Sequence, residues 1–401
     1  MFLPVLLVRD YGVWGFVVFA VPNVIGAAAM GWVLRDGASQ RIVAKHRAML
    51  RQFSIVTIAF QWSFMVWLLE MAPVDWRVFG AAAVLVCGLG FYRLPRSVCV
   101  PLAVCVLLLS LGTLAVVAVQ GVESPLQTLL KGQPLTLATR PGLEYLAPVC
   151  VFGFALCPYL DLTFHRARQR FDERCGRAAF TIGFGVFFAA MIALTYLYAP
   201  AFDLSGLMTP WGSTLATSLV VVHIFVQLAY TCGVHNQELV DPDIDRPWWR
   251  MLQSYGVLEG LTLAVLVTLS SKKILDLVLP LSWQVHLPLP LREVIYRCFM
   301  AFYGLVFPAY VWLCMIPTAD AHSGIAGARG RSKLRVFAAA CLLAAPCYWI
   351  GFVERREKWL VLGLGVVLAA RLLVRRSSAS MPQEGTSDRA RHGLVTPGEQ
   401  A

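Results

Sequence analysis

The sequence predicts an all-α fold, a polytopic bundle of about eleven transmembrane helices. Of the 401 residues, 58% are hydrophobic and only 14% are charged, whereas a typical soluble domain has about 45–50% apolar and about 25% charged residues. The apolar residues gather in runs long enough to cross a bilayer, for which about 20 residues suffice. Helices are expected because lipid cannot pair with exposed backbone groups.

The net charge of +11 would suit a nucleic-acid partner, but the basic residues lie mainly in short loops between the apolar runs. The loops on the side of the first connecting loop, together with the juxtamembrane tail, hold 21 Lys and Arg, and the segments on the other side hold 10. Because cytoplasmic loops are enriched in Lys and Arg, we expect the N-terminus outside and the C-terminus in the cytoplasm, in the cell membrane. The expected partners are the lipid bilayer and a small polar solute, with no nucleic acid.

Eleven runs are predicted as spans, over residues 11–34, 52–70, 76–92, 98–118, 145–165, 178–199, 212–233, 251–271, 293–317, 336–353 and 359–376. Together they form one transmembrane domain over residues 1–376. The remaining segment, 377–401, is polar and contains Pro and Gly, and we expect it to be a disordered cytoplasmic tail.

The first span contains "FAVPNVIGAAAMGW", which places a proline and an amide at mid-membrane. Pro22 is expected to kink the helix because proline removes a backbone hydrogen bond. Asn23 is a candidate for solute binding; the alternative is a packing helix whose Asn bonds to a neighbour. Ala27 and Gly31 form a face of small residues for close helix packing. In the second span, Gln61 is a further candidate for solute binding.

The fifth span contains "FGFALCPYLDLTFHRAR". Pro158 frees the carbonyl of Phe154, and an opened turn presents backbone dipoles as in the midplane sites of transporters. We predict that the helix is interrupted near Cys157 and Pro158, and that Tyr159 and Asp161 face the bundle interior. The alternative is that Asp161 is interfacial, since it lies about one helical turn from the predicted cytoplasmic end.

Two later spans carry further polar groups. His223 and Gln227 are four residues apart and therefore share a helix face; they form either a hydrogen-bonded packing pair or a proton relay. Glu259, in the eighth span, is expected to be protonated in hydrocarbon and to have a proton-coupled or a structural role. Hydroxyls at Thr217 and Ser218 either bind Na⁺ or bond to their own backbone.

An acidic loop carries Asp241, Asp243 and Asp245, a spacing that can hold Mg²⁺ in diphosphate chemistry. No second acidic motif accompanies it, and the sequence has neither a Walker A nor a G-x-S-x-G motif. We therefore do not expect an enzyme. A membrane enzyme acting on lipid-linked substrates is the remoter alternative.

The order of small residue, proline and arginine in "FGFALCPYLDLTFHRAR" resembles the sixth core helix of the sodium:solute symporter family, within the APC superfamily. The family pattern is Gly-x-x-Gly-x-Pro-x-x-x-x-Arg; one Gly is missing here. The resemblance implies a leucine-transporter-type core of five plus five inverted helices. It makes the span 11–34 core helix two and the span 212–233 core helix eight, with Thr217 and Ser218 near a Na⁺ site.

The resemblance also implies that core helix one is missing from this chain. Either translation starts further upstream, or the chain derives from a truncated gene, or it does not transport. The leading hypothesis is a secondary transporter or transporter-like protein that moves a small polar solute with Na⁺ or H⁺, with no other cofactor. The main alternative is a non-transporting scaffold or sensor, which predicts a collapsed interior without a cavity joining Asn23, Asp161 and His223.

Overall fold

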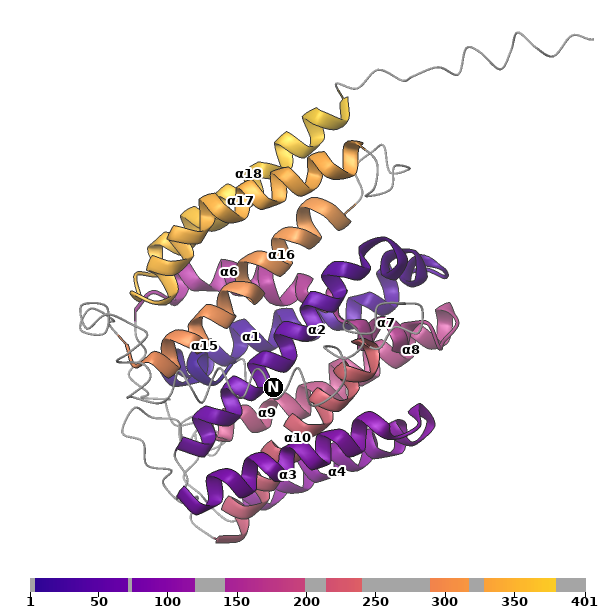
Figure 1. Ribbon diagram of the computed structural model, residues 1–401, viewed down its shortest axis with the longest axis vertical. Coiled ribbons are helices and arrows are strands. Elements are labelled where there is room, and N and C mark those ends of the chain that lie inside the picture. The colour runs from indigo at the N-terminus through magenta and orange to yellow at the C-terminus, as the bar shows by residue number, and fades with distance from the viewer. Residues whose placement is uncertain are drawn as a thin grey trace, which may run out of the picture.

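The computed structural model describes residues 4–70, 74–119, 141–198, 214–239, 289–316 and 328–379. These residues form helices that pack together in a bundle (Figure 1). Among them, eight helical segments are long and apolar enough to cross a membrane. The predicted class, an all-α polytopic bundle, is confirmed. The predicted span 251–271 lies outside the described residues, as do the acidic loop and the tail beyond residue 379.

The helical elements follow the predicted spans closely. In chain order they are α1 (Val5–Val33), α2 (Ala38–Glu70), α3 (Val74–Arg93), α4 (Arg96–Val119), α6 (Leu143–Leu156), η1 (Cys157–Leu160), α7 (Leu162–Arg168), α8 (Glu173–Ile182), η2 (Gly183–Phe188), α9 (Ala189–Tyr198), α10 (Thr214–Leu239), α15 (Leu291–Ala301), η4 (Phe302–Val306), α16 (Phe307–Tyr310), η5 (Val311–Met315), α17 (Ala328–Phe352) and α18 (Lys358–Ala379).

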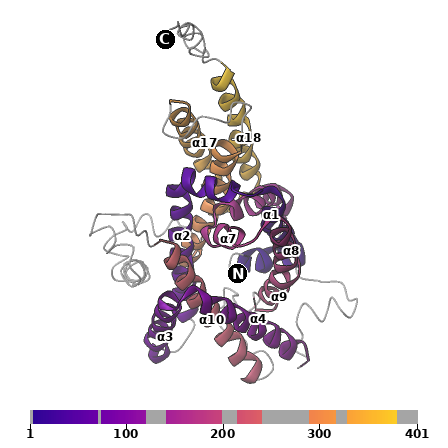
Figure 2. The same ribbon diagram turned by 90° about the vertical axis from the view of Figure 1, so that its right-hand side faces the viewer.

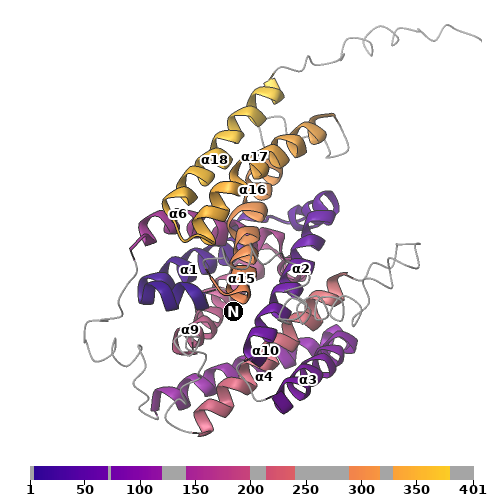
Figure 3. The same ribbon diagram turned by 60° about the vertical axis from the view of Figure 1, so that its left-hand side comes forward.

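The bundle has two edges formed by different groups of helices, and a further group of helices packs between them. The helices α17 and α18 pack together at one edge, and α3 and α4 lie at the opposite edge with α10 (Figures 1 and 3). Between the edges, α1 packs on α6 and α8, while α2 packs on α10, α15 and α7. Viewed along the bundle, α7 lies between α1 and α2 (Figure 2).

The interior joins α2 and α15 through aromatic side chains. Trp62 and Tyr296 are among the largest fully buried side chains. The ring of Tyr296 meets those of Phe60 and Trp67 edge-on, at centroid distances of 5.3 and 5.7 Å. Such pairs add about 0.5–1.5 kcal/mol each beyond the burial of their area, so this contact fixes the position of the 291–316 segment against α2.

Close packing of α1 depends on small residues, as predicted. A Cβ on Gly26 would lie 2.4 Å from the carbonyl oxygen of Ala155 in α6, and one on Gly31 would lie 2.9 Å from the carbonyl oxygen of Gly176 in α8. Ala27 is completely buried. The backbones of α1, α6 and α8 therefore approach more closely than larger side chains allow.

The bend of α1 is not where the sequence predicts it. The backbone stays helical at Pro22, and it leaves helical angles at Gly12 (φ 60°, ψ −141°). Glycine adopts positive φ without a steric penalty, whereas the single hydrogen bond that Pro22 removes is lost without breaking the helix. The non-helical residue of α1 is therefore Gly12, ten residues before Pro22, at which the sequence predicts a kink.

The segment from 291 to 316 contains two π-helical turns, η4 and η5. Such turns are rare and disturb the regular pairing of backbone groups. In η4, the carbonyl of Tyr303 accepts a hydrogen bond from the Cys157 thiol at 3.3 Å, and that of Gly304 accepts one from the Tyr348 hydroxyl at 3.0 Å. The η4 turn is thereby fixed directly against the break in the fifth span.

Candidate functional site

The fifth span is interrupted where the sequence predicts it. The helix α6 ends at Leu156, a 3₁₀ turn follows over residues 157–160, and Asp161 has extended backbone (φ −80°, ψ 111°) before α7 begins. Pro158 is buried in this turn. The break follows from proline's missing N–H and from its clash with the preceding turn. A short second helix then starts from Asp161.

Asp161 starts that helix with one oxygen of its carboxyl group. Its Oδ1 accepts hydrogen bonds from the backbone N–H of Thr163 at 2.8 Å and from the Thr163 hydroxyl at 2.6 Å, an N-cap arrangement. The residue is only 8% exposed, and Tyr159 is half-buried. Asp161 therefore faces the interior of the bundle, as predicted, and the apolar segment long enough to cross a membrane, Leu143–Leu160, ends one residue before it.

The second oxygen of Asp161 faces a histidine from another helix. Its Oδ2 lies 3.9 Å from Nε2 of His235 in α10, and both side chains are largely buried. Nδ1 of His235 is 3.1 Å from the hydroxyl of Ser54 in α2. The row Ser54, His235 and Asp161, hereafter the polar row, thus joins α2 and α10 to the helix break.

A second histidine holds the break in place. Nε2 of His165 donates to the carbonyl of Tyr159 at 2.9 Å, and Nδ1 lies 2.9 Å from the hydroxyl of Ser39 in α2. Because a carbonyl only accepts, the proton of the neutral ring belongs on Nε2 and the Ser39 hydroxyl donates to Nδ1. Gln169 donates to the same hydroxyl oxygen at 3.1 Å. This completely buried histidine is therefore a structural partner of the break.

A hydroxyl pair extends the site toward the π-helical segment. Thr57, three residues after Ser54 in α2, has its Oγ1 3.1 Å from the hydroxyl of Tyr303 in η4. Three elements distant in sequence, α2, the break and η4, thereby contribute polar groups to one buried region. Within the described part of the chain, no three His, Cys, Asp or Glu side chains converge as metal ligands do.

The other predicted site residues lie elsewhere. His223 is bonded to Ser110 of α4, with Nδ1 and Oγ 3.1 Å apart. It precedes His235 by twelve residues, which is about 18 Å along a helix. Gln61 is buried in α2, and its Oε1 has no hydrogen-bond partner in the structure. Asn23 is half-buried in α1.

The proposed ion ligands are not placed in this region. Ser218 is exposed near the start of α10. The side chain of Thr217 and the whole of Glu259 lie outside what the structure describes. Asn23, Asp161 and His223 do not line the cavity between α1, α6 and η4, the cavity beside Arg35 and Arg168, or the cavity beside Arg166 and Tyr230.

A second polar cluster, not predicted from the sequence, lies at the opposite end of the bundle. We call the ion-paired side chains from α1, α15 and the turn between α17 and α18 the ionic cluster. Its members are Arg9, Asp10, Glu293, Arg297 and Arg355. Asp10 accepts from Arg297 at 2.8 Å and pairs with Arg355 at 3.1 Å. Glu293 accepts from Arg9 at 2.9 Å and from Arg297 at 2.8 Å.

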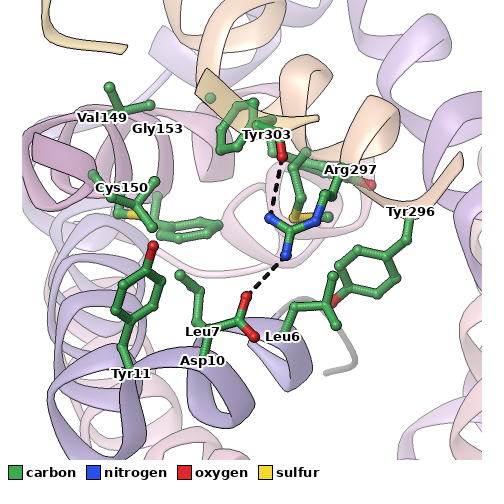
Figure 4. A pocket seen from close by; sticks show the side chains of 15 residues that line it. Leu6, Leu7, Asp10, Tyr11, Val149, Cys150, Gly153, Tyr296, Arg297 and Tyr303 are labelled. Carbon is green, nitrogen blue, oxygen red and sulfur yellow. Dashed lines mark hydrogen bonds and ion pairs between the residues drawn. The ribbon is translucent and has the colours of Figure 1, made fainter. Parts of the chain in front are cut away.

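A small cavity lies beneath the ionic cluster. Asp10 and Arg297 face each other at its edge, and Tyr11 and Cys150 lie on its wall (Figure 4). Its volume is about 40 Å³, and a water molecule needs only about 10–15 Å³ measured in this way. The cavity therefore has room for a few water molecules between α1, α6 and η4.

Comparisons with protein-family models, with curated proteins and with solved structures find no match to this chain.

Proposed function

We propose that this protein is a secondary transporter that moves a small polar solute together with a proton, and that Asp161 and His235 carry this proton. One observation carries the proposal. A buried carboxylate lies at a break in a membrane helix, 3.9 Å from a buried imidazole. Ionisable residues within membrane spans are costly and mark ion and proton pathways, and broken helices form the binding sites of many transporters.

The chemistry of the polar row favours a proton over Na⁺. Asp161 and His235 supply a carboxylate and an imidazole, the side-chain types that form proton relays within membranes. With the proton on His235, the two groups attract each other as an ion pair and hold α10 against the break. Without that proton the attraction is lost, while Oδ1 of Asp161 continues to cap α7. Protonation thus changes the contact between two helices without unfolding either of them.

The likeness to sodium:solute symporters is part of the same proposal. That family's sixth core helix is broken, and the break at residues 157–161 is what the likeness implies for this chain. The compact interior corresponds to a closed state in this proposal. The excess of basic residues in alternate loops supports a cytoplasmic position for the α7 end of the bundle.

Transport is tested in proteoliposomes loaded with a pH-sensitive dye. A panel of radiolabelled amino acids, sugars and small organic anions is offered with a pH gradient, with a Na⁺ gradient or with neither. We expect uptake of at least one solute that follows the pH gradient and acidifies the lumen. Asp161→Asn is expected to abolish this coupled uptake, because asparagine still caps a helix but cannot carry the proton. His235→Gln is expected to do the same.

Two matched variants control for general damage. Asp172→Asn changes another helix-capping aspartate, which accepts from Cys175 at 2.7 Å at the start of α8. His46→Gln changes another buried histidine, bonded to Tyr310. Both are expected to keep uptake. Uptake driven by Na⁺ alone would show that the coupling ion is wrong. If no gradient drives uptake of any solute, the scaffold or sensor alternative stands.

A further inference from the structure

A groove runs along one face of the bundle at the end that carries α7. It has a volume of about 410 Å³ and is formed by α4, α7, α10 and η2. Most of its wall is apolar. The apolar wall residues are Val100, Ala103, Phe164, Phe184 and Val234. Neither the polar row nor the ionic cluster contributes to this groove.

Polar groups in the wall are already occupied. The hydroxyl of Tyr230 donates to the carbonyl of Cys99 at 3.5 Å. Gln237 donates to backbone carbonyls at the end of α3, among them Phe91 at 2.9 Å. Because these groups have partners within the protein, the interior of the groove offers an occupant mainly apolar contact.

One end of the groove is basic. Arg166 and Arg170 are four residues apart on α7 and just after it, so both face the groove. Arg166 uses Nε and Nη2 to bind Glu238, at 3.3 and 3.1 Å, and this pair does not use Nη1. Arg170 is exposed. Two guanidinium groups therefore line this end of the groove.

The intervening arginine does not contribute to the groove. Arg168 is almost completely buried on the other side of α7, where its Nε donates to the carbonyl of Leu34 at 2.9 Å. The sequence "RARQR" therefore divides into one arginine that fixes the helix and two that present donors to the groove. Guanidinium groups bind phosphate well because their N–H donors match its geometry.

We propose that this groove binds an anionic phospholipid. One acyl chain lies along the apolar wall, and the phosphodiester contacts Nη1 of Arg166 and the guanidinium of Arg170. The negative charge of a phosphodiester suits the two guanidinium groups at this end of the groove. Basic sites between transmembrane helices on the cytoplasmic side bind anionic headgroups, and the loop charges predict that this end is cytoplasmic. This binding does not depend on the proposed transport.

The proposal is tested by native mass spectrometry of the detergent-solubilised protein, titrated with phosphatidylglycerol or with phosphatidylcholine. We expect tighter binding of phosphatidylglycerol. Arg170→Gln is expected to weaken that binding about fivefold, the equivalent of about 1 kcal/mol per basic residue, with little effect on phosphatidylcholine. The matched control is Arg174→Gln, which removes the same charge from an exposed arginine outside the groove and should leave the preference unchanged.

A second pair of variants tests the apolar wall. Ala103→Trp fills the groove and is expected to weaken binding of both lipids, while Val104→Trp adds the same bulk at a neighbouring exposed position and should not. Size-exclusion chromatography checks that each variant is folded. Equal binding of the two lipids overturns the proposal. So does an equal loss of phosphatidylglycerol binding in Arg170→Gln and Arg174→Gln, or unchanged lipid binding in Ala103→Trp. Displacement by glycerol 3-phosphate would also overturn it, since that ligand has no acyl chain.

Discussion

Glu293 is almost completely buried, yet positive charge surrounds it on α1 and α15. Its carboxylate accepts hydrogen bonds from both Arg9 and Arg297. Bringing a charge out of water costs several kcal/mol, and only close opposite charges with good hydrogen bonds offset this cost. The ionic cluster therefore holds its helices together only while all of its members are present.

Replacing Glu293 with glutamine removes one of the two carboxylates that Arg9 and Arg297 share and leaves Asp10 as the other. We expect Glu293→Gln to lower the free energy of unfolding by about 3–5 kcal/mol, the usual effect of removing one partner of a buried ion pair. The measurement is an equilibrium SDS titration of the protein in bicelles. Arg356→Gln is the control, because the pair of Arg356 with Glu354 is exposed and should contribute only about 0–1 kcal/mol. Equal decreases in the free energy of unfolding for Glu293→Gln and Arg356→Gln would show that the ionic cluster does not stabilise the bundle more than an exposed ion pair does.

The crossing of α1 and α6 depends on one missing side chain. At Gly26 a Cβ would lie 2.4 Å from a backbone oxygen of α6, and backbone cannot move aside as a flexible side chain can. The crossing in turn positions α6, whose C-terminal end leads into the break at Asp161. A change at residue 26 is therefore expected to act on the whole bundle.

We expect Gly26→Val to separate α1 from α6 and to destabilise the protein by about 1–3 kcal/mol or more, as overpacking does elsewhere. The readout is the thermal unfolding temperature in detergent, together with the yield of monodisperse protein. Gly90→Val in α3 introduces the same residue where an added Cβ would meet no atom within 4 Å beyond the adjacent residues and backbone of its own helix. If Gly90→Val lowers the thermal unfolding temperature as much as Gly26→Val does, the effect comes from valine in a helix and not from the helix crossing.

Whether a break could be predicted depends on what causes it. The break at residues 157–161 follows from proline chemistry, which is local, and it was predictable from the sequence. The change of backbone angles at Gly12 occurs at a glycine, but glycines elsewhere in α1 keep helical angles, so the residue type alone does not mark its position. Pro22 shows the converse, because a residue that usually bends helices lies in a part of α1 with helical backbone angles.

For the molecule as a whole, the apolar helices and their order could be predicted, and eight of the eleven predicted spans correspond to described helices long and apolar enough to cross a membrane. Partners across the bundle could not be predicted. Asp161 was a candidate from its place beside Pro158. Its partner His235 lies two residues beyond the predicted span 212–233 and is not among the predicted site residues. Arg9 and Glu293 are separated by 284 positions. Arg9 lies just before the predicted span 11–34 and Glu293 begins the predicted span 293–317, and both positions are predicted on the same side of the membrane. This is the only local indication that the two charges could meet.

The orientation of the molecule can be tested with one native cysteine. Cys175 is exposed at the α7–α8 end, where the loop charges predict the cytoplasm. We expect a membrane-impermeant maleimide to label it only after the cells are permeabilised, with the labelled peptide identified by mass spectrometry. A cysteine introduced by Arg356→Cys at the opposite end should be labelled in intact cells. The reverse pattern would invert the predicted orientation.

The ionic cluster also constrains how the chain is made. Arg9 and Asp10 emerge from the ribosome early, but their partners in α15 follow 284 or more residues later. At about 5–20 residues per second, synthesis of that interval takes roughly 15–60 seconds. Tyr11 waits longer still, since its partner Glu357 follows 346 residues later. During this time the first helix must keep its charged end at the membrane surface or beside an insertion chaperone, and its outer segment reaches its final place only when the last helices arrive.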